Sequence, residues 1–135
     1  MIGVREYRMT DYFDVSRILE EAFGVTKANV NPDNNYKEYV AVVNDVVAGY
    51  LVLTRVLDLV KGIPYYLVDY VCVAKSYRNL GLGQLLMERV LEVARKDKAL
   101  YVELTSRKDR VAAHHLYEKV GFEKRDSYIY RRTLQ

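Results

Sequence analysis

The sequence predicts an α/β fold: a single domain with a mixed, mostly antiparallel sheet flanked by helices. The chain has 135 residues, a length typical of one domain. Half of its residues are hydrophobic, enough to bury a core without disulfides or a structural metal. Stretches with strand-like alternation are interleaved with stretches of helical spacing, and no repeat or linker divides them. We therefore expect one domain over residues 1–135.

The first predicted elements are a strand and a helix. Residues 2–8 alternate weakly between apolar and polar side chains, as in a strand. Thr10 then offers an N-cap for a helix that carries Asp11 and Asp14 in its positive first turn. The apolar residues of this helix recur on one face: Val15, Ile18, Leu19 and Ala22. Gly24 is the residue type that commonly ends a helix.

A polar segment and a hairpin follow. Residues 24–37 are rich in asparagine, which predicts a loop or a broken helix suited to substrate contacts. Residues 39–43 and 46–54 have the composition of strands. They flank Asn44-Asp45, which we expect to form a two-residue hairpin turn.

The second half adds strands and helices in alternation. Residues 65–73 are apolar on both faces, which predicts a central strand. The apolar spacing over residues 82–93 predicts a helix of about four turns. Residues 100–105 alternate, and after this crossover helix they should pair in parallel with residues 65–73. The last expected elements are a helix over residues 109–119, closed by Gly121, and a strand over residues 127–134.

The composition narrows the function classes. Cys72 is the only cysteine and the chain has two histidines, so we expect no disulfide and no metal site. No apolar stretch is long enough to span a membrane and no signal-peptide pattern opens the chain, so we expect a cytoplasmic protein without a membrane partner. Residues 69–135 carry 14 basic and 9 acidic side chains, against 7 and 9 in residues 1–68. This basic half favours an anionic partner, either a nucleic acid or a phosphorylated cofactor.

A glycine-containing loop precedes the helix over residues 82–93. It consists of Arg78, Asn79, Leu80, Gly81, Leu82 and Gly83. Alternate glycines let backbone N–H groups approach an anion at the positive end of a helix. The loop lacks the Lys-Ser or Lys-Thr of a P-loop, and Leu86 stands where a dinucleotide fingerprint has its third glycine. The loop therefore indicates pyrophosphate binding, with a tight strand-to-helix turn as the alternative interpretation.

A second motif lies downstream, where a short amphipathic helix carries Tyr117 and is followed by Gly121 and Phe122. Together with the Arg-x-x-Gly-x-Gly loop, this motif resembles the GNAT superfamily of acyl-CoA-dependent N-acetyltransferases. The resemblance covers nearly the whole chain. It implies an enzyme that uses acetyl-CoA as co-substrate and a sheet with a splayed central pair of parallel strands.

The resemblance also implies which residues bind acetyl-CoA. Backbone N–H groups of the loop from Arg78 to Gly83 would hold its pyrophosphate. The pantetheine arm would lie along the strand at Val71, Cys72 and Val73, where that strand splays from residues 101–105. Arg110 is a further contact, at a position where the family often has an asparagine. The Cys72 side chain itself is expected to be a buried small hydrophobe and not an acyl carrier.

The same resemblance assigns catalytic roles. Tyr117 matches the tyrosine that protonates the departing CoA thiolate, and a phenol with a pKa near 10 is protonated at neutral pH. Packing in the core is the alternative role for Tyr117. The amine must also lose a proton, for which Asp69, the one charge in an apolar strand, and Glu103 are the candidate bases. Ion pairs with arginines would explain both carboxylates equally well, and a water chain could replace them.

We expect the acceptor to be the primary amine of a small molecule, bound by residues 23–37 and 56–64. A protein lysine or N-terminal amine, and a catalytically silent CoA-binding module, are the alternatives. The basic residues surround a phosphate loop and not an aromatic-lined groove, so we expect no nucleic-acid partner. The strand expected over residues 127–134 could pair with a second copy in a homodimer.

Overall fold

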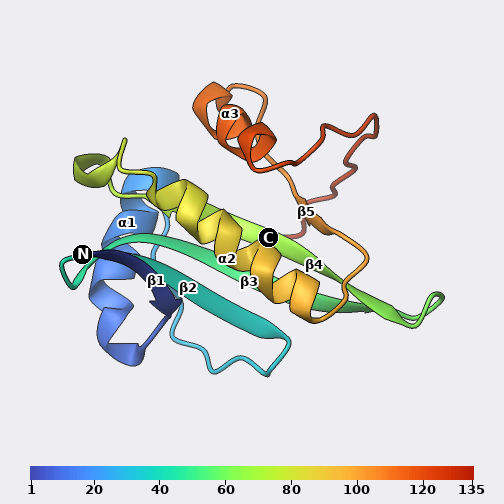
Figure 1. The fold of residues 1–135 in the computed structure, drawn as a ribbon, viewed down its shortest axis with the longest axis horizontal. Coiled ribbons are helices and arrows are strands. Elements are labelled where there is room, and N and C mark those ends of the chain that lie inside the picture. Colours follow the sequence, from blue (N-terminus) through green and yellow to red (C-terminus); the bar gives the residue numbers. More distant parts are fainter.

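The computed structural model describes residues 1–135 as one mixed sheet with helices on both faces (Figure 1). The elements follow in the order β1 (Ile2–Glu6), η1 (Met9–Asp11), α1 (Tyr12–Phe23), β2 (Tyr36–Val43), β3 (Val46–Asp58), β4 (Ile63–Val73), η2 (Lys75–Tyr77), α2 (Leu82–Lys96), β5 (Val102–Leu104) and α3 (Val111–Lys119), where η1 and η2 are 3-10 turns. This order confirms the predicted α/β class. None of the helices combines the length and the apolar character that crossing a bilayer requires.

The sheet has the strand order β1-β2-β3-β4-β5. Its first three strand pairs are antiparallel, and β4 pairs with β5 in parallel. The parallel pair follows from α2, because a crossover helix returns the chain to the same end of the sheet. The prediction of β4 as the central strand is corrected in one respect: β3 is the middle strand, and only β5 separates β4 from the sheet edge.

Each face of the sheet is covered by one long helix. In Figure 1, α2 crosses in front of the sheet and α1 lies behind it. The buried residues of α1 pack with those of one face: Val15, Ile18, Leu19, Val40, Val47, Tyr50 and Cys72. The buried residues of α2 belong to the cluster on the other face: Leu82, Leu86, Met87, Val90 and Ala94. The helical spacing in the sequence therefore identified the buried stripe of α1 and the position of α2.

The hairpin between β2 and β3 has the predicted turn. Asn44 and Asp45 have φ angles of 49° and 68°, so both adopt the left-handed conformation of a type I′ turn. This turn matches the twist of the flanking strands and leaves Val43 opposite Val46 in the register. The first helix also ends as predicted, at Gly24 with a φ of 70°.

The predicted cap of the first helix is wrong. Thr10 lies inside η1, and α1 begins only after Asp11, which makes no side-chain capping bond to the helix. The Asp11 carboxylate instead accepts two hydrogen bonds from the Arg5 guanidinium, at 2.8 and 2.9 Å, and one from the N–H of Arg8. The ion pair ties the start of the helix to β1.

The predicted last strand is also wrong. Residues 127–134 form no strand, and the side chains of Tyr128 and Tyr130 are 86% and 92% exposed. Alternating side chains make a strand only where the backbone finds a hydrogen-bonding partner. The free edge of β5 is only three residues long, and residues 127–134 do not pair with it.

Candidate active site

The backbone of β4 changes direction beside Asp69. One residue of β3, Leu51, lies opposite two residues of β4, Tyr70 and Val71. This arrangement is a β-bulge, and Tyr70 in it has a φ of 57°. The bulge places the exposed side chains of Asp69 and Tyr70 directly beside the buried Val71.

Strands β4 and β5 separate just beyond this bulge. Their parallel pairing ends at Val68 and Leu104, which confirms the predicted splay. A pocket of about 190 Å³ lies where the strands part, and it is lined by Phe23, Val68, Asp69, Tyr70, Val71, Leu104, Thr105, Arg110 and Tyr117. A larger hollow of about 370 Å³ lies between the start of the chain and the Asn44-Asp45 turn, but it contains none of the predicted site residues.

Tyr117 brings a phenol from α3 into this pocket. Its side chain is only 7% exposed and lies beside Phe122, with 6.2 Å between the ring centroids. Burial raises the pKa of the Tyr117 hydroxyl, and the positive charge of Arg110 opposes part of that rise. No protein group forms a hydrogen bond with this hydroxyl, so its proton is available to a ligand.

The two candidate bases lie in different places. Asp69 lines the same pocket as Tyr117 and takes part in none of the ion pairs of the structure. Glu103 is exposed on β5, opposite Leu67 in the parallel register, and is not part of the pocket lining. The fold therefore brings together Tyr117 and Asp69 and leaves Glu103 apart from them.

The predicted phosphate loop joins η2 to the start of α2. Asn79 and Gly81 have φ angles of 67° and 78°, a left-handed conformation that glycine adopts at little cost. Residues 78–83 donate none of the backbone hydrogen bonds found in turns and loops. Their N–H groups are therefore free at the positive end of a 15-residue helix, which suits an anion.

Glycine at position 83 also allows the last helix to approach. A Cβ atom built on Gly83 would lie 2.9 Å from Leu116 Cδ2, closer than side chains pack. The α3 helix, which carries Tyr117, therefore lies close against the start of α2 at this point.

The three β4 residues predicted beside the pantetheine arm point to alternate faces. Val71 lines the pocket, and Val73 packs against the cluster on the α2 side. Cys72 is 4% exposed in the cluster on the α1 side. Burial raises the pKa of the Cys72 thiol to about 12, so the sulfur is a neutral packing group, as expected.

Arg110 lines the pocket and does not lie among the phosphate-loop residues. Its guanidinium sits over the ring of Phe23, 5.3 Å from the centroid, and Phe23 meets the ring of Tyr70 edge-on at 5.4 Å. Phe23 is the first residue of the segment over residues 23–37 that we expected to bind the acceptor, and no individual role was predicted for it. The structure places its side chain in the pocket lining.

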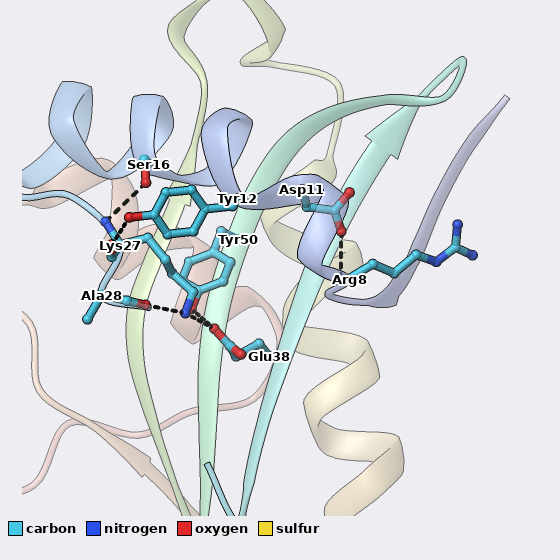
Figure 2. A network of polar contacts seen from close by, with 8 residues as sticks. All are labelled: Arg8, Asp11, Tyr12, Ser16, Lys27, Ala28, Glu38 and Tyr50. Carbon is cyan, nitrogen blue, oxygen red and sulfur yellow. Dashed lines mark hydrogen bonds and ion pairs between the residues drawn. The ribbon is translucent and has the colours of Figure 1, made fainter. Parts of the chain in front are cut away.

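The segment between α1 and β2 is anchored by Lys27 (Figure 2). Lys27 Nζ lies 2.8 Å from Glu38 Oε1 and 4.9 Å from the ring centroid of Tyr7. The Tyr50 hydroxyl donates to the same Glu38 oxygen at 2.5 Å, and the Tyr12 hydroxyl donates to the Lys27 carbonyl at 2.7 Å. The Lys27 and Glu38 side chains are only 10% and 15% exposed, so the segment is held firmly against the sheet.

Comparison with known proteins identifies the family and the fold. A model of the acetyltransferase (GNAT) family matches residues 3–122. No protein of curated function matches the chain by sequence.

Solved structures share the fold at low sequence identity. A transcriptional regulator from Bacillus halodurans superposes with a TM-score of 0.84 at 20% identity, covering 98% of this chain and all of that one. An aminoglycoside acetyltransferase, meta-AAC0020 from an uncultured soil metagenomic sample, gives 0.84 at 14% identity, covering 99% and 97% of the two chains. A ribosomal-protein-alanine N-acetyltransferase from Brucella melitensis gives 0.78 at 16% identity, covering 97% and 99%. These likenesses establish the fold.

Proposed function

The chain belongs to the GNAT acetyltransferase family, and from this premise we propose that it moves the acetyl group of acetyl-CoA to the primary amine of a small molecule. Family membership makes it an acyltransferase. We propose direct transfer in a ternary complex by a domain over residues 1–135. One observation carries the proposal: Tyr117 and Asp69, from elements far apart in the sequence, line the same pocket.

The loop over residues 78–83 is the proposed pyrophosphate site. An anion fits its free N–H groups, its two left-handed residues and the start of α2. A Cβ atom built on Gly81 would meet no other atom within 4 Å, so the loop is open there. The pantetheine arm would then run along the unpaired side of β4 at Val71, Cys72 and Val73, beyond the end of the pairing with β5. Acetyl-CoA supplies the acetyl thioester that the pocket receives.

The proposed reaction needs one group that takes a proton and one that gives a proton. A lysine-like amine with a pKa near 10.4 is neutral in only about one molecule in 2,500 at pH 7. Asp69 would take the proton from the ammonium, directly or through water. The neutral nitrogen then attacks the thioester carbon, and a backbone N–H of β4 would stabilise the oxyanion. The nitrogen would lose its second proton to solvent water when the tetrahedral intermediate collapses to the amide, and this proton balances the one that Tyr117 gives up. Glu103 is a weaker proposal for the base, since it does not line the pocket.

Tyr117 would complete the transfer. When the carbon–sulfur bond breaks, the CoA thiolate needs a proton, and the Tyr117 hydroxyl would donate it. Burial raises the pKa of this phenol, so it holds its proton across the neutral range until the thiolate forms. Its unengaged hydroxyl supports the role as well.

Replacement of the phenol tests the proposal. Tyr117→Phe should lower kcat at least tenfold and change the KM for acetyl-CoA by less than about twofold, because the hydroxyl acts mainly when the thiolate leaves. Tyr101→Phe is the matched control, since Tyr101 is 47% exposed, stacks on Tyr65 and does not line the pocket. Release of free CoA with a broad set of amines is the measurement. Tight CoA binding with no CoA release for any amine would instead indicate a silent CoA-binding module.

A further inference from the structure

The pocket between β4 and β5 contains two opposite charges, neither of which has a partner in the protein. Its lining includes one acidic side chain, Asp69, and one basic side chain, Arg110. Neither takes part in an ion pair, so their charged atoms are more than 4.0 Å apart. Asp69 is exposed and Arg110 is half-buried, and both line the same pocket. Two separated, unpaired charges of opposite sign favour a ligand that supplies a counter-charge to each.

Arg110 is held in place by an aromatic ring and not by an acid. Its guanidinium lies over Phe23 at 5.3 Å from the centroid, which leaves its N–H groups free. A guanidinium of this kind binds the oxygens of a carboxylate or a phosphonate in pairs. Its charge also reaches the Tyr117 phenol, because it lowers the pKa of that group against the larger effect of burial.

The pocket is separate from the phosphate loop. No residue from 78 to 83 lines it, whereas Phe23, at the start of the segment that Lys27 anchors, does. An anion bound at Arg110 would therefore belong to the molecule that enters from the side of this segment.

We propose that the acceptor is a small amine that carries an anionic group: the amine faces Asp69, and a carboxylate, phosphate or phosphonate is bound by Arg110. This inference rests on the proposed function and moves Arg110 from the acetyl-CoA side of the site to the acceptor side. The volume of about 190 Å³ has room for about six water molecules, which fits an acceptor of a few non-hydrogen atoms. A polyamine is disfavoured, because its second ammonium would meet the Arg110 guanidinium.

Matched pairs of amines test the inference. The pairs are 4-aminobutanoate with 4-aminobutanamide, and 2-aminoethylphosphonate with ethanolamine, which distinguish a carboxylate from a phosphonate. Release of CoA gives kcat/KM, and NMR titration against the protein saturated with CoA gives binding independently of turnover. We expect the anionic member of at least one pair to be favoured tenfold or more in both measurements.

Variants assign that preference to one side chain. Arg110→Gln should reduce the preference to less than about threefold and leave the KM for acetyl-CoA unchanged, with thermal unfolding as the check on folding. Arg107→Gln is the matched control, because the Arg107 side chain is 82% exposed and does not line the pocket. This control should keep the full preference.

Two results would overturn the inference. One is equal use and equal binding of both members of each pair. The other is an Arg110→Gln variant that alters only the KM for acetyl-CoA, which would return Arg110 to the acetyl-CoA side. If no amine releases CoA but anionic amines still bind through Arg110, the proposed function fails and the ligand preference stands.

Discussion

A tyrosine hydroxyl in this protein is available for chemistry only where no carboxylate engages it. The Tyr50 hydroxyl donates to Glu38 and the Tyr66 hydroxyl donates to Asp97, at 2.5 and 2.6 Å. Burial and the neighbouring carboxylate raise the pKa of both phenols, that of Tyr66 to about 12. The Tyr117 hydroxyl has no such partner and faces the pocket. The absence of a partner, together with its place in the pocket lining, supports Tyr117 among the thirteen tyrosines as the proposed proton donor.

The buried thiol of Cys72 should be chemically silent in the folded protein. With a pKa of about 12, only about one thiol in ten thousand is ionised at pH 8, and the side chain is 4% exposed. We expect thiol reagents to leave the native protein unmodified at pH 8 and to label one thiol per chain in denaturant. Mass spectrometry of the intact protein measures both states.

The same measurement tests direct transfer. After incubation with acetyl-CoA alone, Cys72 should carry no acetyl group, and Cys72→Ala should keep kcat within about twofold, since its sulfur faces the α1 side of the sheet. An acetylated Cys72 that passes its acetyl group to an amine would contradict both the silent thiol and the ternary complex.

At the scale of elements, Lys27 is expected to hold in place the segment between α1 and β2, which we propose to contact the acceptor. Lys27→Met removes the charge that balances the Glu38 carboxylate, which is 15% exposed and would keep only Tyr50 as a partner. Loss of one partner from a buried charged pair costs about 1–3 kcal/mol of unfolding free energy. The segment would loosen as well. We therefore expect the KM for the amine to rise severalfold and the KM for acetyl-CoA to stay the same, as steady-state kinetics can measure.

Lys37→Met is the matched control for this anchor. Lys37 belongs to the same part of the chain, but its pair with Glu6 spans 3.6 Å and the two side chains are 45% and 66% exposed. An exposed pair of this kind contributes at most about 1 kcal/mol. A similar rise in the KM for the amine in both variants would show that the effect is one of net charge and not of the anchor.

Elements whose signals are local could be predicted, and elements that depend on distant partners could not. The buried stripe of α1, the position of α2 and the Asn44-Asp45 turn follow from spacing and turn chemistry within a few residues. The strand expected over residues 127–134 is absent, because its formation depends on a partner edge that the sequence cannot display. The cap expected at Thr10 is also absent, because Arg5 in β1 binds Asp11 and fixes the start of the helix.

The candidate site also combines features with local sequence signals and features that depend on distant parts of the chain. The candidate phosphate loop and Tyr117 could be proposed from the sequence because each belongs to a motif of neighbouring residues. The choice between Asp69 and Glu103 could not be made, because it depends on the bulge at Tyr70 and on where β4 and β5 separate. The orientation of Arg110 toward Phe23 is a tertiary contact with no local signal of its own.

For the molecule as a whole, two carboxylates connect the helices to the sheet. Asp11, at the start of α1, is 5% exposed and pairs with Arg5 of β1 at 2.8 Å. Asp97, at the end of α2, pairs with Arg55 of β3 at 2.7 Å and accepts a hydrogen bond from Tyr66 of β4 at 2.6 Å. The arginine partners hold the pKa of both carboxyls below the ordinary value of 3.8.

These carboxylates should govern unfolding in acid. A carboxyl whose pKa is lower in the folded than in the unfolded chain stabilises the fold when it is ionised. For Asp11 and Asp97 this contribution is complete at pH values well above 3.8. It is lost as the pH falls through the lowered pKa of the folded state. Urea unfolding of the wild type should therefore show a loss of stability below about pH 4. Asp11→Asn should lower the free energy of unfolding by about 1–3 kcal/mol at pH 7. On acidification the stability of this variant should fall by less than that of the wild type, because the contribution of the ionised Asp11 carboxylate is already absent.

Asp14→Asn separates this effect from a general change in charge. Asp14 pairs with Arg17 on the surface, with side chains 46% and 76% exposed, so its removal should change stability by less than about 0.5 kcal/mol at any pH. Asp97→Asn should act in the same direction as Asp11→Asn, and the two effects should add, since the residues lie at opposite ends of different helices. A double variant that loses as much stability between pH 7 and pH 3 as the wild type would show that other groups control acid unfolding.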